Sequence, residues 1–232
     1  MKLLRLSLLT VLAAAMLASV AYAAFPLRSP QVPFSNSALQ TYLAGKGQVI
    51  NTLTGQVDGQ IWASSLAGKA TFTFMLEATP SAPFNSIGIY NRYGWPSPTL
   101  FQVFPGAATV GWYATVSFNV VAQTAAVQLF DMNDVYQGTT HHVGVDGDNF
   151  GFYISRPGAL FYSQDIGNPG GAPQILTYPG SGQSTGQWWE CFEDHPYVPA
   201  TSQFVSAVLE IESTVPVATH STSWGRLKGL YR

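Results

Sequence analysis

Charged residues are scarce in this sequence. Only 9% of its 232 residues are Asp, Glu, Lys or Arg, and the formal net charge is −2, whereas about 25% of the residues in an average globular protein are charged. This composition excludes a coiled coil, a charge-rich disordered chain and a basic protein that binds nucleic acid. With 47% hydrophobic residues, the chain has enough apolar side chains for a globular core.

Cysteine is almost absent as well. Cys191 is the only one in the chain, so no intramolecular disulfide can form. It lies in the apolar run Trp188–Phe192, where a buried thiol packs like a small hydrophobic side chain. His195 is close in sequence, but Glu193 and Asp194 make the surroundings acidic, whereas a reactive thiolate needs an electropositive setting. We therefore predict a buried, unreactive thiol.

The first 23 residues have the pattern of a secretory signal peptide. Lys2 and Arg5 are followed by the apolar run Leu6–Val20, and Ala21-Tyr22-Ala23 has the small-x-small pattern of a cleavage site. The apolar run is shorter than the ~20 residues of a membrane-spanning helix. We expect an exported mature chain with no transmembrane segment, located outside the cell, at its surface or in the periplasm. A retained N-terminal anchor is the alternative.

From Gln48 onward, apolar and polar residues alternate with a period of two. Gly, Pro and Asn interrupt this pattern at roughly ten-residue intervals, which is typical of antiparallel strands with one face in a core. We count about ten candidate strands by these signals. A single sheet would leave its apolar face in water, so we predict an all-β antiparallel sandwich, jelly-roll-like. The inward-facing sets that the alternation predicts are Phe72, Phe74 and Leu76; Trp112, Ala114, Val116, Phe118 and Val120; Phe150, Phe152 and Ile154; and Val205, Ala207, Leu209 and Ile211.

One short helix is predicted before the strands begin. Ser37 and Gln40 have the spacing of a capping box, Leu39 and Leu43 lie one turn apart, and Gly45 ends the helix. The domain organisation that follows is a signal peptide (1–23), an N-terminal segment with a short helix (24–47), a β-sandwich domain (48–213), and a linker with a basic tail (214–232).

The tail contains Trp224, Arg226, Lys228 and Arg232, whereas the rest of the mature chain is acidic. Such a tail can fold back electrostatically or dock to an export or surface component, which makes it a candidate sorting signal. A frayed terminus without a role is the alternative.

Two residue patterns in the sequence are similar to those of catalytic sites. Gly182–Gly186 matches the G-x-S-x-G motif around Ser184, but that motif needs a strand before the serine and a helix after it. Here it lies in a Gly- and Ser-rich loop that leads into another strand. Glu190 and Glu193 are three residues apart, so on one strand they point to opposite faces. We predict a non-enzymatic protein, and an extracellular hydrolase is the less favoured alternative.

Acidic side chains gather in two loops. Asp146, Asp148 and Asn149 form one group and Glu193 and Asp194 the other, and oxygen-rich loops of this kind can hold Ca²⁺. The EF-hand pattern fails in the first loop, and Asp-Gly and Asp-Asn are also favoured hairpin residues. A metal site and a simple turn are therefore both open for that loop.

Aromatic residues make up 13% of the chain, and some of them can form a flat platform that stacks on sugars. The candidates are Trp95, Trp188, Trp189 and Tyr178. Burial in the core is the alternative for each of them. Because Trp188 and Trp189 are adjacent on a predicted strand, we expect at most one to lie deep in the core.

Six short segments carry a resemblance to a known family: Ile87–Asn91, Phe150–Ile154, Phe161–Asp165, Asn168–Gly171, Gln174–Tyr178 and Cys191–Asp194. With them, residues 71–212 resemble exported bacterial proteins of the domain-of-unknown-function 4114 family and relatives with PEP-CTERM sorting tails. The resemblance implies an extracellular β-sandwich with adhesion, matrix or surface roles. Ala200–Ala207 lacks the aspartates that family members carry there, so an implied metal site is limited to Glu193 and Asp194. The hydrophobic sorting helix is also missing.

These observations favour a secreted or surface-associated protein that acts in binding, adhesion or extracellular assembly. Its partner would be an extracellular ligand, a glycan or a surface protein. The alternative is a carbohydrate-binding module with a structural Ca²⁺ ion.

Overall fold

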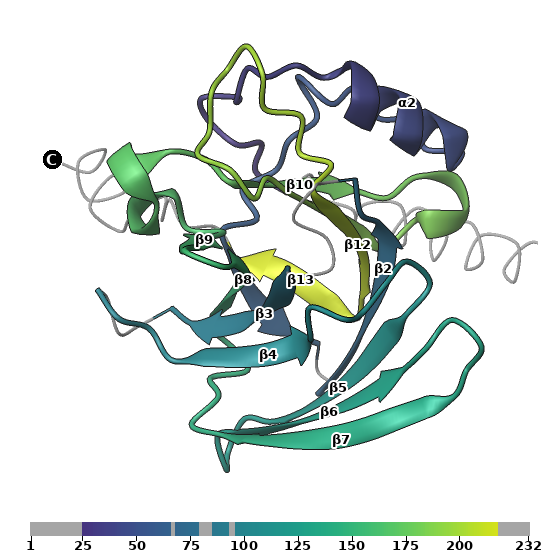
Figure 1. Ribbon diagram of the computed structural model, residues 1–232, viewed down its shortest axis with the longest axis vertical. Coiled ribbons are helices and arrows are strands. Elements are labelled where there is room, and N and C mark those ends of the chain that lie inside the picture. Colours follow the sequence, from purple (N-terminus) through teal and green to yellow (C-terminus); the bar gives the residue numbers. More distant parts are fainter. Residues whose placement is uncertain (1–24, 66–67, 79–84, 93–95, 218–232) are drawn as a thin grey trace, which may run out of the picture.

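The computed structural model of this protein describes residues 25–65, 68–78, 85–92 and 96–217 (Figure 1). The predicted signal peptide lies outside these residues, as do Trp95 and the candidate sorting residues Trp224, Arg226, Lys228 and Arg232. Across the described residues, no helix is both long enough and apolar enough to span a membrane.

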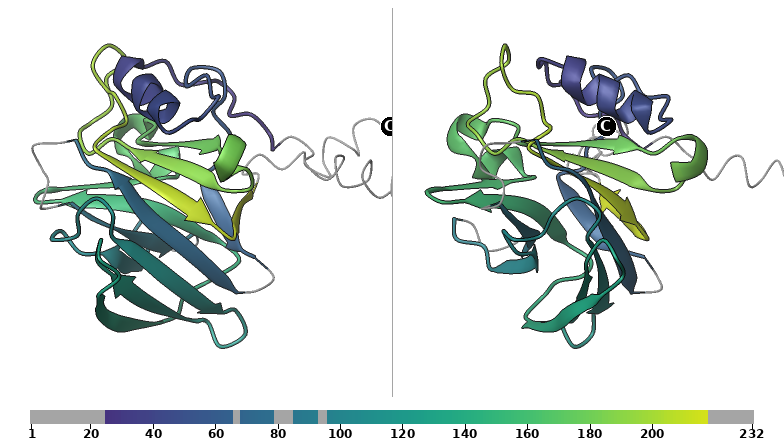
Figure 2. Two further views of the ribbon diagram at one scale, coloured as in Figure 1. Left: turned by 90° about the vertical axis from the view of Figure 1, so that its right-hand side faces the viewer. Right: turned by 45° about the vertical axis from the view of Figure 1, so that its right-hand side comes forward.

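The described residues form thirteen strands in two antiparallel sheets, together with one α-helix, which confirms the predicted all-β sandwich (Figures 1 and 2). The six-stranded sheet has the order β13 (Thr214–Val217), β1 (Ile61–Ser64), β8 (Phe150–Arg156), β3 (Ser86–Asn91) and β4 (Leu100–Phe104), with β9 (Ala159–Tyr162) paired to β8. The seven-stranded sheet has the order β10 (Ile175–Pro179), β11 (Trp188–Phe192), β12 (Ala207–Glu212), β2 (Lys69–Leu76), β5 (Tyr113–Asn119), β6 (Thr124–Phe130) and β7 (Tyr136–Val143). Three short 3₁₀ turns lie in the connections: η1 (Asp165–Gly167), η2 (Pro169–Gly171) and η3 (Gly182–Ser184).

The core between the sheets is built from the alternating apolar residues of the predicted strands. Phe72 and Phe74 of β2 and Phe152 of β8 are buried there, and the rings of Phe72 and Phe152 meet edge to face with their centroids 5.3 Å apart. Trp62 of β1 packs on Phe152 in the same way, at 5.5 Å. Burial of one such ring contributes about 1.5–3 kcal/mol to the free energy of folding. These contacts therefore fix which face of each strand turns inward.

The alternation breaks down at the end of β2. The register between β2 and β12 shifts between Val208 and Leu209, so that Leu76 lies opposite Val208 instead of continuing the inner row. Both side chains pack in the cluster on the outer face of the sheet. The prediction that Leu76 faces the inner core is therefore wrong, because β2 has an extra residue, Met75, between the positions that pair with Leu209 and Val208, and the alternation of the sequence does not show such a bulge.

Helix α2 (Ser37–Gly45) forms where it was predicted, and it lies over the outer face of the seven-stranded sheet (Figure 2). Leu39 and Leu43 are fully buried against that face. The predicted capping box is wrong: Asn36 is the N-cap and makes no side-chain capping bond. The Gln40 side chain instead accepts a hydrogen bond from the amide of Thr52 at 3.0 Å, because the following loop folds back over the helix.

The C-terminal boundary also differs from the prediction. Residues 214–217, expected to be a linker, form the edge strand β13, in which Pro216 lies opposite Trp62 of β1. Proline is tolerated here because an edge strand leaves one row of amides without a strand partner. Ser213, with φ of 61°, connects β12 in one sheet to β13 in the other.

Candidate cation site at the end of strand β11

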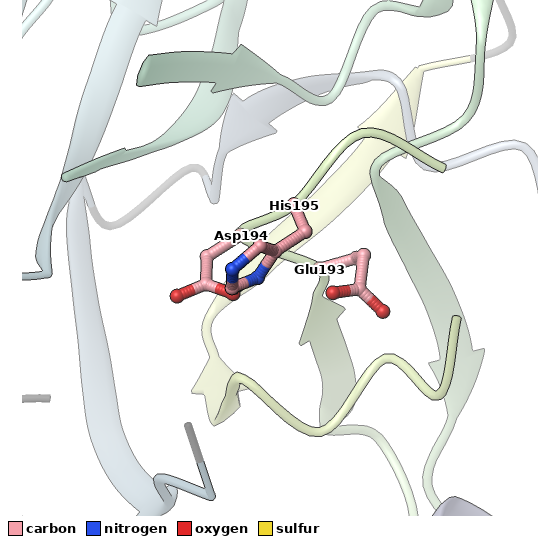
Figure 3. A group of neighbouring side chains, drawn as sticks. All are labelled: Glu193, Asp194 and His195. Carbon is pink, nitrogen blue, oxygen red and sulfur yellow. The ribbon is translucent and has the colours of Figure 1, made fainter. Parts of the chain in front are cut away.

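Glu193, Asp194 and His195 follow directly after β11 and turn their side chains toward one another (Figure 3). Their potential ligand atoms all lie within 4.8 Å of each other. Glu193 and Asp194 are buried, whereas the His195 side chain is 51% exposed. Within the part of the chain that the structure describes, this is the one group of three or more potential metal-ligating residues.

The backbone holds this segment in place on both sides. The amide of Glu193 donates to the carbonyl oxygen of Gln174 at 2.9 Å, and the amide of Ser206 donates to that of Phe192 at 3.0 Å. The Arg156 side chain donates from Nε to the carbonyl oxygen of Asp194 at 2.6 Å. The cluster is therefore attached to the rigid sheet at the point where β11 ends.

Asp194 orients the imidazole of His195. Its Oδ1 lies 2.6 Å from His195 Nδ1 and accepts a hydrogen bond from Ser206 Oγ at 2.9 Å, and its Oδ2 accepts one from Asn85 Nδ2 at 3.1 Å. A carboxylate can only accept hydrogen bonds, so Nδ1 carries the proton. In the neutral ring, Nε2 then presents its lone pair, the arrangement found in carboxylate–histidine–metal sites.

Glu193 is fixed by the loop that connects β11 to β12, residues 193–206. The amide of Gln203 donates to Glu193 Oε2 at 2.9 Å. A small pocket of about 160 Å³ lies beside the cluster. Its lining includes Glu193, Asp194, His195, Thr201, Gln203 and Ser206. The pocket is large enough for an ion with its bound waters, because one water occupies about 30 Å³ in the liquid.

Two residues that the sequence did not single out, Glu77 and Asn85, lie beside Asp194. Burial, and secondarily the charge of Asp194, raises the pKa of Glu77 to about 7. No described residue hydrogen-bonds to the buried oxygens Glu77 Oε1 and Asn85 Oδ1. Buried acceptors without donors are costly. Only strand pairing brings these residues here, so no local sequence signal could have identified them.

The other predicted metal residues do not join this cluster. Asp146 Oδ1 accepts a hydrogen bond from the amide of Asp148 at 3.1 Å, and the amide of Asn149 bonds to the Asp146 carbonyl oxygen at 3.3 Å. These are bonds of a turn closed by its own aspartate side chain. Among the described residues, Asp146 and Asp148 belong to no group of three ligand side chains, which favours the turn over the metal site.

The predicted sugar-stacking platform is wrong for the three aromatic residues that are described. The exposed fractions of Trp188, Trp189 and Tyr178 are 4%, 1% and 0%. Trp188 lies in the core between the sheets, and Trp189 and Tyr178 lie beneath α2. Both tryptophans are deep because the helix covers the outer face of the sheet, which the alternation alone could not show.

The hydrolase motif does not have the surroundings of a nucleophile. Ser184 ends the 3₁₀ turn η3, which leads into β11 and not into a helix. Its Oγ donates to Glu210 Oε1 at 2.6 Å and accepts from Gln48 Nε2 at 3.1 Å. Glu190 is fully buried, with Thr177 Oγ1 donating to it at 2.5 Å, so it does not share a cleft with Glu193.

Cys191 is fully buried, as predicted, and burial raises the pKa of its thiol well above the ordinary value.

Comparison with known proteins adds no assignment for the residues of the candidate site. No family model matches the chain, and a search of curated proteins finds no significant relative.

Proposed function

We propose that this protein is an exported, non-enzymatic β-sandwich that binds an extracellular partner, and that a divalent cation at Glu193, Asp194 and His195 orders its binding surface. The observation that carries the proposal is the cluster itself: two buried carboxyl groups and an oriented imidazole within 4.8 Å. Export is supported by the sequence of residues 1–23.

The ligand set favours Zn²⁺ over Ca²⁺. Zn²⁺ is commonly bound by imidazole together with carboxylates. The hydrogen bond to Asp194 leaves His195 Nε2 as a ligand atom, so in this arrangement Glu193 and His195 bind the ion directly and Asp194 orients the imidazole. Ca²⁺ takes six to eight oxygen ligands. It would need additional oxygens, such as those of Glu77 and Asn85, and would not use His195. Ca²⁺, the ion expected from the sequence, is therefore the second candidate.

A cation here would act on the loop of residues 193–206. This loop projects from one end of the sandwich beside α2 (Figure 1), and Glu193 and Gln203 hold its two ends together. An ion bound at the base of the loop would restrict its conformations before a partner binds. Such preorganisation strengthens binding because less ordering remains to be done on association.

Isothermal titration calorimetry on the mature chain with Zn²⁺ and with Ca²⁺ tests the cation site. We expect Zn²⁺ to bind, and His195→Asn to weaken binding by at least about tenfold. At a hundredfold excess over Kd, the ion should add about 2.7 kcal/mol to the free energy of unfolding, and EDTA should remove this gain. Asp148→Asn is the matched control and should leave affinity unchanged.

Two further results would decide between the alternatives. Binding of Ca²⁺ that His195→Asn does not affect would assign an all-oxygen calcium site to the same loop. Absence of heat for both ions, with a Tm that EDTA does not change, would contradict the cation site altogether.

The non-enzymatic part of the proposal is supported by the surroundings of Ser184, whose hydroxyl is engaged with a carboxylate and an amide. The test is an activity screen on ester, peptide and glycoside substrates. Turnover that disappears in Ser184→Ala would overturn this part of the proposal and favour the hydrolase.

A further inference from the structure

A second cavity lies near the cation site and is not explained by it. It has a volume of about 320 Å³, which is at the lower end for pockets that hold small molecules. One wall is formed by residues 28–33 of the N-terminal segment. Asp58 and Gln60, which precede β1, also line the cavity, as do Asp165 of η1 and Tyr197 of the loop 193–206. We call this cavity the Arg28 pocket.

The polar groups of the Arg28 pocket are held in place by the protein. Arg28 is only 7% exposed and forms an ion pair with Asp165. The amide of Asp165 donates to Gln60 Oε1 at 3.0 Å, and Gln60 Nε2 donates to the carboxylate of Asp58 at 3.2 Å. Main-chain bonds, such as Arg28 N to the Gln56 oxygen at 2.9 Å, anchor the wall itself. A site of this kind is preorganised.

The charges of the pocket limit the chemistry of a ligand. One guanidinium and two carboxylates, those of Arg28, Asp58 and Asp165, line the same small volume. The carboxylates would repel an anion, and an apolar ligand would cover the exposed parts of these charged groups without replacing the hydrogen bonds that they make to water. Hydroxyl groups both donate and accept hydrogen bonds, so they can satisfy the guanidinium and the carboxylates together.

The remaining surface of the pocket is apolar and partly flat. The Tyr197 ring and the rings of Pro30 and Pro173 line it, and the Tyr197 hydroxyl donates to the carbonyl oxygen of Pro33, which fixes the ring. A sugar has C–H faces that pack on such rings while its hydroxyls meet the polar wall. The Arg28 pocket therefore has an apolar surface on which a sugar ring can pack, whereas Trp188 and Trp189 are buried and cannot contact a ligand.

We propose that the Arg28 pocket binds a neutral polyhydroxylated ligand, namely a single sugar unit, free or at the end of a glycan. Asp58, Asp165 and Arg28 hydrogen-bond to its hydroxyls, and Tyr197 packs against its ring. This inference does not rest on the cation site, because none of the three cation ligands lines the pocket.

Saturation-transfer NMR with glucose, galactose, mannose and N-acetylglucosamine at millimolar concentration tests this inference. At least one sugar should bind, and Tyr197→Ala and Asp165→Asn should each weaken binding by about tenfold or more. Asp148→Asn, at an exposed position that does not line the pocket, is the control and should retain sugar binding. Circular dichroism and thermal melts verify that each variant folds.

Asp165→Asn breaks a partly buried ion pair and can lower stability. Tyr197→Ala, a change at a half-buried position, is therefore the second, independent variant. Putrescine and inorganic phosphate are the comparison probes. Binding of either one without any sugar would overturn the proposal in favour of a cationic or anionic ligand. No sugar binding, or sugar binding unchanged in Tyr197→Ala, would also overturn it.

Discussion

Gly151 of β8 lies directly opposite Tyr90 of β3, and the Tyr90 ring occupies the space that a side chain at position 151 would need. A Cβ atom on residue 151 would come within 2.5 Å of the ring and its hydroxyl. Tyr90 is fully buried, and its hydroxyl donates to Gln164 Oε1 at 3.2 Å, beside the segment that carries Asp165. The glycine therefore makes room for a contact that ties η1 to the sheet.

We expect Gly151→Ala to lower the free energy of unfolding by about 1–3 kcal/mol, the usual cost of overpacking in a well-packed interior. Urea denaturation followed by circular dichroism measures this change. Gly45→Ala is the matched control: a Cβ there meets no atom within 4 Å, and alanine is a better helix former than glycine. Equal stability of Gly151→Ala and the unchanged protein would mean that the Tyr90 ring can move aside at little cost.

Leu43 tests whether α2 is an integral part of the sandwich. Its side chain is fully buried in the cluster that contains Tyr178, Trp189 and Cys191. Leu43→Ala should therefore cost about 2–5 kcal/mol, the range for creating a cavity in a core. Val49→Ala, at a position 90% exposed, should change stability little when both are measured by urea denaturation. A loss below 1 kcal/mol for Leu43→Ala would show that the helix is only loosely attached.

The sequence predicts well what depends on one sheet facing one core. Phe72 and Phe152 lie where the alternation places them because the residues that bury them belong to the same repeated pattern. The pattern fails for Trp189, since the helix that covers it comes from residues 37–45, far away in the chain. The alternation of apolar and polar residues in a strand does not show whether a distant segment covers its outer face.

In the candidate sites too, the sequence indicates residues that are neighbours in the chain but not residues that only the fold brings together. Glu193, Asp194 and His195 are neighbours in sequence, so part of this cluster is visible as an acidic pair in the chain. Glu77 reaches it through tertiary contacts alone. The ion pair between Arg28 and Asp165 joins residues 137 positions apart, and nothing in either segment of the sequence indicates that the two residues meet.

Glu190 should make stability depend on pH. It is fully buried, and desolvation by burial raises its pKa well above the ordinary value of 4.5. The folded chain therefore keeps a proton that the unfolded chain releases, so this contribution is complete below about pH 4.5 and is lost as the pH rises toward the folded pKa. Glu190→Gln stays neutral at every pH, and its Tm should fall less between acidic and alkaline pH than that of the unchanged protein.

Thermal melts across that pH range provide the measurement for Glu190. Glu212→Gln at the half-buried end of β12 is the control for removing a carboxyl group, and its profile should follow that of the unchanged protein. Parallel profiles for Glu190→Gln and the unchanged protein would show that Glu190 does not contribute to the pH dependence.

Strand β13 should be needed for stability although the sequence marks it as a linker. Pro216 pairs with Trp62, and Trp188 Nε1 donates to the carbonyl oxygen of Thr214 at 3.1 Å. A chain that ends at Ser213 loses that acceptor and uncovers Trp62, and one orphaned buried donor alone costs about 1–3 kcal/mol. We expect the chain that ends at Ser213 to unfold at a lower urea concentration than a chain that ends at Val217. Equal urea midpoints would show that β13 does not contribute to the free energy of unfolding.

The chain that ends at Val217 also allows the basic tail to be tested separately from the fold. If Arg226, Lys228 and Arg232 dock to an acidic surface component, removing residues 218–232 should move the protein from the envelope fraction to the medium. Replacing the three basic residues by glutamine should have the same effect, because the charge and not the length of the tail would be responsible. Immunoblots of cells, envelope and medium measure the distribution. Identical distributions of the full chain and both variants would show that the tail does not sort the protein.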